Sequence, residues 1–380
     1  MKQSSRIPFN RSYIDQNDHK LVLDMLKNSP LEGGGEFNHK CESFIEKKFK
    51  IPKCLTTASC TAALEMMPLV LDLKAGDEII MPSYTFVTSA SSFVLRGCVP
   101  VFVDIKLDDL NIDESKIEAA ITSRTKAILM MHYGGVACNF SSIKKIAKKH
   151  GLIILEDAAQ AIGSKYRDKF LGSLGDLASY SFHGTKNITC GEGGAYLINK
   201  ISLLKKSLKV YEKGTNRYDF IRSKVNKYTW VELGSSNILS NFASSLLFSQ
   251  LKKSVFITND RIKTWNKYFS YLSKHHFNNN LFRLSNVPNY ASHNAHLFFM
   301  IFYSKKVMNT FREKMQNRGI QCSPHYTPLH LSPFGKQNSK VIGELKNTKL
   351  ATENLIRLPI WPGINSDLVI SSINDVFEEL

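Results

Sequence analysis

Short hydrophobic runs alternate with amphipathic segments through the first two hundred residues. Six runs have the length of buried strands, at residues 78–81, 100–103, 127–132, 153–156, 177–182 and 195–198. Segments with apolar positions three and four residues apart lie before and between them, at residues 19–28, 38–49, 59–73, 85–96 and 141–150. Apolar strands separated by helices are typical of a mostly parallel sheet that helices cover on both faces. The pattern therefore predicts an α/β fold.

The pattern changes in the last third of the chain. A long helical region is predicted over residues 236–271, and short strand-like and helical segments follow it, at residues 296–302, 306–318, 320–324, 355–359 and 365–380. We therefore expect a large domain over residues 1–255 and a smaller α+β domain over residues 256–380. Pro68, inside the helix predicted over residues 59–73, indicates a kink or an early end there.

The charge balance raises the question of a nucleic-acid partner. Lys and Arg total 50 against 33 Asp and Glu, which gives the 380-residue chain a net charge of +17. Such an excess suits polyanions, but it also attracts small anionic substrates. Residues 200–227 alone hold nine basic and two acidic side chains. The charge by itself leaves both interpretations open.

The cysteine spacing and the hydropathy of the chain indicate the compartment in which the protein works. The seven cysteines are an odd number and no two have the Cys-x-x-Cys spacing, so neither a disulfide framework nor a metal site is predicted. No apolar run approaches the roughly 18 residues of a membrane span, and the first ten residues contain no apolar signal segment. We expect a cytoplasmic protein with reduced thiols and no membrane partner.

Lys186 stands in a polar turn that follows the predicted strand over residues 177–182 and precedes a glycine-rich stretch. Open α/β sheets bind ligands just beyond the carboxyl ends of their strands. A desolvated lysine at that position can attack a carbonyl group. Taken alone, the pattern fits a solvated loop lysine better, since lysines in loops are common.

Three further segments place chemically suitable groups at comparable positions. Asp157 ends another apolar strand, where it can pair with a cation or a protonated ring nitrogen, or cap a helix. Small hydroxyl residues before residue 60 open a helix, whose free N–H groups either bind an anion such as phosphate or carry an ordinary Ser59 cap. Tyr84 and Phe86 can stack on a planar cofactor or lie in the core. In combination, the four segments describe the usual protein contributions to pyridoxal phosphate chemistry.

Five ordered motifs resemble one known family. They are Thr-Ala-Ser-Cys-Thr-Ala-Ala-Leu-Glu-Met at residues 57–66, Gly-Asp-Glu-Ile-Ile-Met-Pro-Ser-Tyr-Thr-Phe-Val at 76–87, Glu-Asp-Ala-Ala-Gln at 156–160, Ser-Phe-His-Gly-Thr-Lys-Asn at 181–187 and Gly-Glu-Gly-Gly at 191–194. The chain resembles the pyridoxal-phosphate sugar aminotransferases of the DegT/DnrJ/EryC1/StrS family over nearly its whole length. Within that family it is most similar to the dTDP-4-oxo-6-deoxyglucose 4-aminotransferases. The resemblance implies an aspartate-aminotransferase-like fold.

The resemblance also implies roles for single residues. Lys186 would hold pyridoxal 5′-phosphate through its amino group and then transfer protons. Asp157 would pair with the pyridinium nitrogen, Gln160 with the ring hydroxyl, and Phe86 would stack on the ring. The remaining implied cofactor contacts are the backbone of Cys60 and Thr61, the Ser181 hydroxyl, His183, and Ser236 of a partner subunit.

Substrate contacts are implied at two further places. Lys213 and Arg217 lie in a loop that meets a diphosphate or is simply a solvated basic loop. His325 and Tyr326 belong to a stretch that resembles the part of the family facing the nucleotide sugar. Members of the family are usually homodimers with active sites at the subunit interface.

The implied reaction is transfer of an amino group from L-glutamate to C4 of dTDP-4-keto-6-deoxyglucose. The dTDP-4-amino-4,6-dideoxyhexose formed would serve cell-surface glycans such as the O-antigen of lipopolysaccharide.

Gly184 departs from the pattern of the most similar group, where Glu is expected. Three alternatives stay open: a 3-aminotransferase, a dehydratase of the same fold (whose members carry His in place of the lysine), and a basic nucleic-acid-binding protein without activity. Neither the configuration at C4 nor the choice between dTDP and UDP follows from the sequence.

Overall fold

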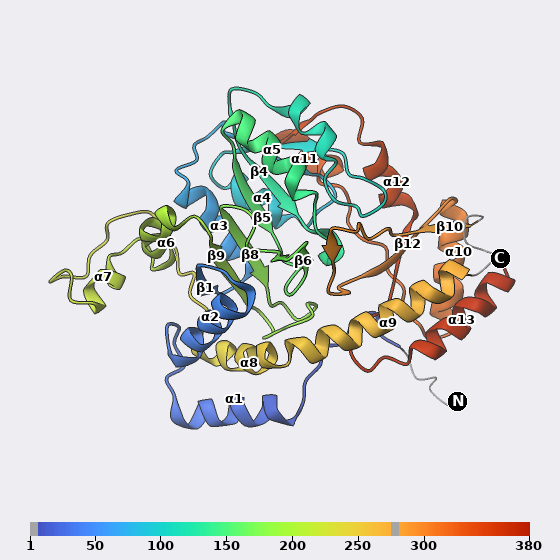
Figure 1. Cartoon of the computed structure of the whole chain (residues 1–380), viewed down its shortest axis with the longest axis horizontal. Helices are drawn as coiled ribbons and strands as arrows, with labels where there is room; N and C mark the ends of the chain where they lie inside the picture. Colours follow the sequence, from blue (N-terminus) through green and yellow to red (C-terminus); the bar gives the residue numbers. More distant parts are fainter. Residues whose placement is uncertain (1–6, 275–280) are drawn as a thin grey trace.

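An eight-stranded sheet forms the centre of the protein in the computed structural model, which describes residues 7–274 and 281–380 (Figure 1). In spatial order the strands are β1 (Lys53–Thr57), β9 (Gly194–Ile198), β8 (Leu177–Ser181), β5 (Ile153–Asp157), β4 (Thr125–Met131), β2 (Glu78–Pro82), β3 (Val99–Val103) and β13 (Lys340–Val341). β9 runs antiparallel to both of its neighbours, and the other pairs are parallel. The predicted mostly parallel α/β sheet is confirmed.

Both faces of this sheet are buried, as the uninterrupted apolar strands require. Successive residues of one strand enter different hydrophobic cores: Ile79 and Met81 lie in one, and Ile80 lies in the other. The helices α2 (Glu36–Phe49), α5 (Phe140–His150) and α8 (Asn241–Lys252) supply one core. The other receives α3 (Cys60–Val70), α4 (Thr88–Val94) and α6 (Leu204–Tyr211), while α1 (Gln16–Asn28) packs on α8.

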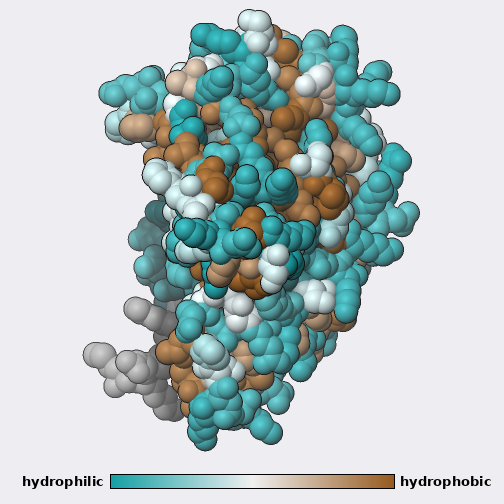
Figure 2. Space-filling model, turned by 90° about the vertical axis from the view of Figure 1, so that its left-hand side faces the viewer, coloured by the Kyte–Doolittle hydropathy of each residue, from teal (hydrophilic) through white to brown (hydrophobic). Residues whose placement is uncertain are grey.

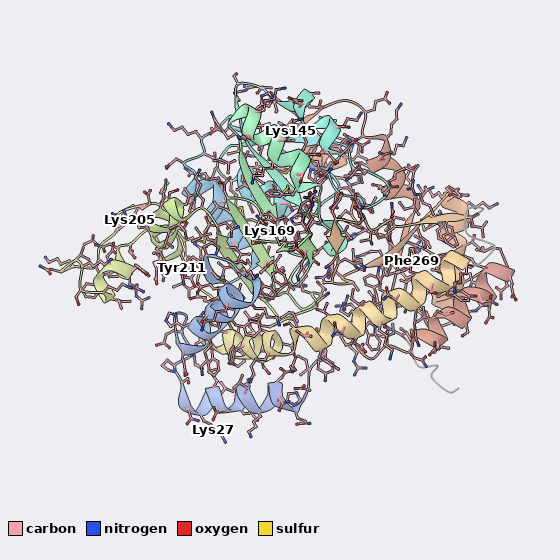
Figure 3. All side chains as sticks on the ribbon, viewed as in Figure 1. Lys27, Lys145, Lys169, Lys205, Tyr211 and Phe269 are labelled. Atoms are coloured by element: carbon pink, nitrogen blue, oxygen red, sulfur yellow. The ribbon has the colours of Figure 1, made fainter. Side chains whose placement is uncertain are left out.

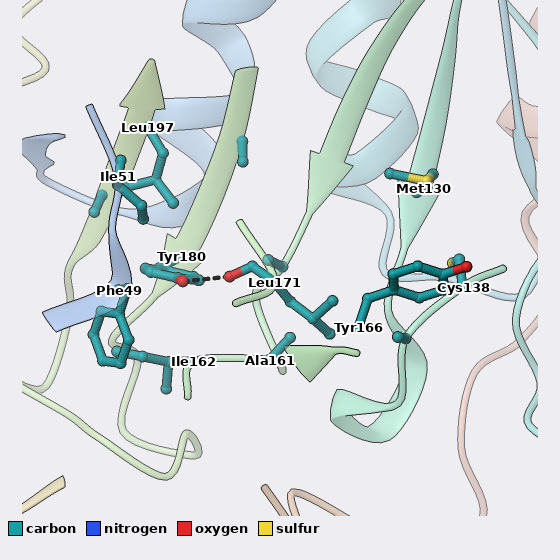
Figure 4. Packing of buried hydrophobic residues seen from close by; sticks show 14 of the residues in the cluster. Phe49, Ile51, Met130, Cys138, Ala161, Ile162, Tyr166, Leu171, Tyr180 and Leu197 are labelled. Carbon is teal, nitrogen blue, oxygen red and sulfur yellow. Dashed lines mark hydrogen bonds between the residues drawn. The ribbon is translucent and has the colours of Figure 1, made fainter. Parts of the chain in front are cut away.

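Figure 4 shows part of one of these cores, in which buried side chains such as Phe49, Leu171 and Tyr180 pack together. The rings of Phe49 and Tyr180 pack in a T-shaped arrangement with centroids 6.0 Å apart, and the Tyr180 hydroxyl donates a hydrogen bond to the carbonyl of Leu171. Burying a side chain of this size stabilises the fold by about 2 kcal/mol or more. The carboxylate of Glu156 accepts hydrogen bonds from the backbone N–H groups of Gly172, Leu174 and Gly175. The turn of residues 172–175, which leads from β7 (Lys169–Phe170) into β8, is thereby tied to β5.

A third core lies in the C-terminal part. The sheet β10 (Phe282–Leu284), β12 (Phe298–Phe302) and β14 (Leu355–Leu358) packs with α9 (Ser254–Lys274), α10 (Lys305–Asn317) and α13 (Ser366–Glu378). The remaining elements are the small sheet of β6 (Lys165–Tyr166), β7 (Lys169–Phe170) and β11 (Ala291–Ser292), and the helices α7 (Arg217–Ile221), α11 (Pro333–Asn338) and α12 (Lys346–Asn354). Turns of 3-10 helix occur at Glu114–Lys116, Glu118–Ala120, Tyr133–Gly135, Ile201–Leu203 and Leu329–Leu331. The predicted domain boundary after residue 255 falls within the first turn of α9 and stays a prediction.

The helical region predicted over residues 236–271 consists of two helices: α8 begins at Asn241 and ends at Lys252, and α9 begins at Ser254. The chain turns at Lys253, whose ammonium group pairs with Asp15 and Asp18 before and inside α1. Ile238 forms a bridge to Thr57 at the edge of the sheet, so the first residues of the predicted helix are extended. The helix predicted over residues 59–73 ends early, at Val70, two residues after Pro68.

In the described part of the chain, no helix is both long and apolar enough to cross a membrane.

Candidate active site

A cavity of about 590 Å³ opens at the carboxyl ends of the central strands and is closed from the other side by β14 and the chain around residue 325. Ten of the thirteen residues expected at a cofactor or substrate line it: Cys60, Thr61, Phe86, Asp157, Gln160, Ser181, His183, Lys186, His325 and Tyr326. A larger, shallow depression of about 920 Å³ along α9 and α13 contains none of them. The smaller cavity is therefore the candidate active site.

Lys186 lies in the turn after β8, and its backbone N–H donates to the carbonyl of His183 over 2.9 Å. Its amino group makes no hydrogen bond or ion pair with any residue that the structure describes. Burial lowers the pKa of this amine, against the opposing charges of Cys60 and Asp157. A lysine in this setting holds more of its neutral, nucleophilic form than a solvated loop lysine does.

Asp157 ends β5 with its carboxylate fixed from two sides. The Ser89 hydroxyl donates to Oδ2 over 2.6 Å, and the backbone N–H of Ala159 donates to Oδ1 over 3.1 Å. Thr85 Oγ1 lies 2.8 Å from Ser89 Oγ and extends this buried chain. No helix follows Asp157 in residues 158–164, so the helix-cap interpretation is wrong. The carboxylate lines the cavity and suits a cationic ring nitrogen.

Gln160 connects the two halves of the cavity. Its Oε1 accepts a hydrogen bond from the N–H of Gly134 over 2.7 Å, and its Nε2 donates to the Tyr326 hydroxyl over 2.8 Å. The second amide hydrogen stays available. His325 stacks on Tyr326 with ring centroids 3.7 Å apart, and burial lowers the pKa of His325 well below its usual value. His325 is thus neutral at neutral pH.

The start of α3 forms the opposite wall. Ser59 caps the helix by accepting a hydrogen bond from the N–H of Ala62 over 3.0 Å, and the first N–H groups of a helix have no partner within it. A Cβ atom at Gly194 would lie 2.4 Å from the backbone nitrogen of Cys60, so only glycine allows this close approach of β9. Burial raises the pKa of the Cys60 thiol to about 12, which leaves its backbone as the useful group. The arrangement suits a phosphate group.

The two aromatic candidates, Tyr84 and Phe86, lie in different surroundings. Tyr84 is buried in the core, whereas Phe86 is 55% exposed and lines the cavity, where it can cover a planar ring. His183 lies at the mouth of the cavity with its Nε2 atom 3.4 Å from Oε1 of Glu192.

Three expected residues lie outside the cavity. Lys213, Arg217 and Ser236 belong to the segment of residues 212–236, which we call the arm and which projects from the body beside α6 and contains α7 (Figure 1). Arg217 pairs with Glu212 over 3.1 Å within the arm. Figure 2 looks onto this side of the molecule, where hydrophobic side chains lie among hydrophilic ones. Trp230, in the arm, is 77% exposed.

Sequence reasoning missed several residues that line the cavity: Phe9, Asn10, Glu192, His296, Leu297 and Arg357. Arg357 is the most informative, because a charged residue interrupts the apolar run at residues 355–361, and that interruption was a usable signal. His296 accepts or donates a hydrogen bond of 2.9 Å with Asn187, the residue after Lys186.

The residues fit pyridoxal phosphate. An unpaired amine, an anchored carboxylate, an exposed aromatic face and a helix start held open by a glycine surround one cavity. In the described residues no group of three or more His, Cys, Asp or Glu side chains is arranged to hold a metal ion.

Comparisons with known proteins agree with this chemistry. The profile of the DegT/DnrJ/EryC1/StrS aminotransferase family matches residues 12–377. An uncharacterized protein of Methanocaldococcus jannaschii, MJ1066, is 32% identical over 99% of this chain and 98% of its own length.

Two solved structures extend the comparison. PseC of Helicobacter pylori, an aminotransferase involved in the biosynthesis of pseudoaminic acid, superimposes with a TM-score of 0.90 at 27% identity, over 99% of this chain and 100% of its own. The PLP form of the sugar aminotransferase Spr1654 of Streptococcus pneumoniae, described as putative, gives 0.89 at 25% identity, over 98% of this chain and 99% of its own.

Proposed function

The chain belongs to the DegT/DnrJ/EryC1/StrS aminotransferase family, whose members are pyridoxal-phosphate-dependent sugar aminotransferases, and from that premise we propose its reaction. The protein transfers the amino group of L-glutamate to C4 of a nucleotide-linked 4-keto-6-deoxy sugar, dTDP-4-keto-6-deoxyglucose. The product is a dTDP-4-amino-4,6-dideoxyhexose for cell-surface glycans, including the O-antigen of lipopolysaccharide. The observation that carries this proposal is the unpaired amine of Lys186 in a cavity that also holds the anchored carboxylate of Asp157.

Each wall of the cavity has a part in holding the cofactor. The backbone of Cys60 and Thr61 and the hydroxyl of Ser181 would take the phosphate, and Phe86 would cover the ring. Asp157 would face the ring nitrogen and Gln160 the ring hydroxyl. When bound, pyridoxal phosphate supplies an electron sink that stabilises negative charge at the carbon being deprotonated.

Proton transfer falls to Lys186. Its amine lines the cavity that would hold the substrate carbon, and burial lowers its pKa, which leaves more of it unprotonated. It would therefore accept a proton from that carbon and return it to a neighbouring carbon. Burial lowers the pKa of His325 and raises that of Tyr326, so both side chains are uncharged at neutral pH.

Lys186 also bears on the alternatives. The resemblance links the dehydratases to histidine at this position, so the lysine favours aminotransfer. The start of α3, Ser59-Cys60-Thr61, resembles the enzymes that aminate C4 more than those that aminate C3. Basic residues occur on separate helices, such as Lys27 on α1, Lys145 on α5 and Lys205 on α6 (Figure 3), as well as in the dense stretch of residues 200–227. This distribution supports a general surface charge that attracts anionic substrates over a nucleic-acid site.

We further propose a cytoplasmic homodimer. The arm exposes Phe220, Ile221, Tyr228, Trp230, Val231 and Leu233, more apolar surface than an isolated loop commonly presents to water. In a dimer the arm would reach the partner's cavity, where Ser236, Lys213 and Arg217 would meet the cofactor phosphate and the substrate diphosphate. The seven cysteines are free, in keeping with a reducing compartment.

The decisive experiment supplies purified protein with dTDP-4-keto-6-deoxyglucose and L-glutamate. We expect a dTDP-amino sugar and 2-oxoglutarate in equal amounts, and the proton coupling constants of the isolated sugar identify the aminated carbon and its configuration. UDP-linked and 3-keto substrates are assayed in the same way for comparison. Release of water from the sugar without nitrogen incorporation would identify a dehydratase and overturn the proposal.

A further inference from the structure

A buried asparagine, Asn294, connects the two turns that carry Gln160 and Lys186. It lies between β11 and β12, in the C-terminal part of the chain, and is 1% exposed. Its Nδ2 atom donates to the carbonyl of Gln160 over 2.9 Å and to the carbonyl of Ile162 over 3.0 Å. Its Oδ1 atom accepts a hydrogen bond of 3.1 Å from the backbone N–H of His296. These three bonds to the main chain fix the orientation of the amide.

The turn after β8 is tied to the same segment from the other direction. Asn187, which follows Lys186, donates from Nδ2 to the carbonyl of Asn294 over 2.9 Å, and its Oδ1 atom lies 2.9 Å from Nδ1 of His296. Because an amide oxygen can only accept, Nδ1 of His296 carries the proton of this bond. Burial lowers the pKa of His296 well below its usual value, so the ring is neutral. Residues 294–296 therefore hold both turns.

The segment of residues 294–296 is itself fixed by its surroundings. The buried Arg261 of α9 donates from Nε to the carbonyl of Ala295 over 3.0 Å and from Nη2 to the carbonyl of His296 over 2.8 Å. Ala295 has a φ of 50°, which a residue with a side chain adopts only where its surroundings enforce it. A Cβ atom at Gly135 would lie 2.1 Å from Oδ1 of Asn294, so the glycine makes room for the amide.

Gln160 is thereby held at both of its ends. The N–H of Gly134 and the hydroxyl of Tyr326 engage the tip of its side chain, and Asn294 engages its main-chain carbonyl. The amide hydrogen that Gln160 has left for a ligand is placed by these contacts together. Lys186 lines the same cavity from the turn after a different strand, so the distance between the two residues depends on the tie between their turns.

We propose that Asn294 is a positioning residue that sets the place of Gln160 relative to Lys186, an inference that rests on the cofactor contacts of the proposed function. Pyridoxal phosphate carries its ring hydroxyl and its aldehyde on neighbouring carbons of a rigid ring. Gln160 would meet the hydroxyl and Lys186 the aldehyde, so the two protein groups must keep one separation. Asn294 maintains it through one hydrogen bond to each turn.

The test follows the absorption band of the bound cofactor and needs no substrate. Asn294→Leu keeps the branched shape of the side chain and removes the amide. We expect the midpoint pH of the change in the absorption band to rise by about one unit, because a hydrogen bond from Gln160 favours the ionised ring oxygen and its loss raises the pKa. The dissociation constant for pyridoxal phosphate should rise about tenfold.

Asn199→Leu is the matched control. Nδ2 of Asn199 also donates to two carbonyl groups, those of Gly172 and Gly175, over 3.0 and 2.9 Å, but it lies outside the cavity. The control should lose thermal stability as Asn294→Leu does, while it keeps the wild-type midpoint and dissociation constant. A purely structural role of Asn294 predicts the same outcome for both variants, and that result would overturn the inference.

A double-mutant cycle tests whether Asn294 acts through Gln160. Gln160→Met removes the amide from a side chain of similar length and should itself raise the midpoint by about one unit. Asn294→Leu added to Gln160→Met should then raise it by less than about 0.3 unit more. Two rises that simply add would overturn the inference, since Asn294 would then act without Gln160.

Folding is checked by circular dichroism and thermal melting. If Asn294→Leu unfolds, Asn294→Ala leaves space in which water can bond the freed main-chain groups, and a rise of the midpoint is expected there as well. Borohydride trapping on Lys186 tests the proposed function separately. A wild type that traps no cofactor would refute that function, whereas trapping in the wild type with an unchanged midpoint in the folded Asn294 variant would refute only the role of Asn294.

Discussion

The hydroxyl of Ser89 donates a 2.6 Å hydrogen bond to Oδ2 of Asp157, and both residues are buried beside the cavity. We expect Ser89→Ala to lower kcat about tenfold and to weaken cofactor binding, because the carboxylate loses the donor that sets its rotation. The pH at which the cofactor's absorption band changes should shift as well, which loss of packing alone would not cause. Ser92→Ala removes a buried hydroxyl with no hydrogen-bond partner in the described chain and should leave all three quantities unchanged. Equal behaviour of the two variants would contradict a positioning role for Ser89.

Lys186→Ala should keep the fold and lose more than a thousandfold in turnover, since the residue that we propose to attack and to transfer protons is gone. Borohydride treatment of the holoenzyme followed by peptide mass spectrometry should place the cofactor on Lys186 in the wild type only. The pKa of the amine is lowered by burial, so the rate of cofactor attachment should rise with pH along a curve whose midpoint lies below 10.5. Lys169→Ala, on exposed β7, is the control. A cofactor label that persists in the Lys186 variant would refute the assignment.

Glu156→Gln should destabilise the protein by about 2–4 kcal/mol, measured by urea unfolding. The buried carboxylate accepts hydrogen bonds from three backbone N–H groups and lies 3.0 Å from Nε2 of His132. An amide places hydrogens of its own against these donors. Glu118→Gln breaks an exposed cluster with Lys149 and His150 and should change stability little. Similar effects of the two changes would argue against a structural role for the Glu156 network.

Acid should destabilise the protein partly through His293, whose pKa is lowered to about 4 by burial. Between pH 6.5 and about 4 the unfolded chain binds a proton that the folded state excludes, so stability falls as pH falls through this range. His296 and His325 act in the same direction, because burial lowers their pKa as well. His293→Gln keeps an acceptor for the N–H of Ala295 and should flatten this part of the curve of unfolding free energy against pH. The exposed His19→Gln should retain the wild-type slope, and an equal slope for both variants would contradict the assignment.

Trp230→Ser should shift the proposed dimer toward monomer, measured by sedimentation equilibrium over a concentration series. The side chain is 77% exposed in the single chain, so its removal should change the stability of the monomer little and weaken the dimer interface strongly. Lys205→Ser, on nearby α6, tests whether any change to this side of the molecule has the same effect. A wild-type protein that sediments as a monomer at all concentrations would overturn the dimer proposal itself.

Local sequence patterns predicted most of the fold and the part of the candidate site that lies on the central sheet. The apolar strands lie within a few residues of their predicted positions because each is buried on both faces and its pattern is continuous. Lys186, Asp157 and the start of α3 are found at strand ends and a helix start, features that a sequence displays directly.

The remainder depended on distant contacts. Arg357 reaches the cavity from a strand 171 positions after Lys186, and only the packing of the third core brings it there. The break between α8 and α9 is fixed by Asp15 and Asp18, more than 230 residues away from Lys253. The two-residue β13 exists only because β3 offers an edge.

Gly194 has a consequence for anyone who wishes to redesign the enzyme. Because its missing side chain is the space that the backbone of Ser59 and Cys60 occupies, libraries that vary this glycine will return inactive proteins. Gly184 lies in the turn between His183 and Lys186, and the nearest heavy atom to a Cβ built there, the carbonyl oxygen of Gly191, is 3.8 Å away. We therefore expect this position, unlike Gly194, to accept a side chain without displacing the backbone around it.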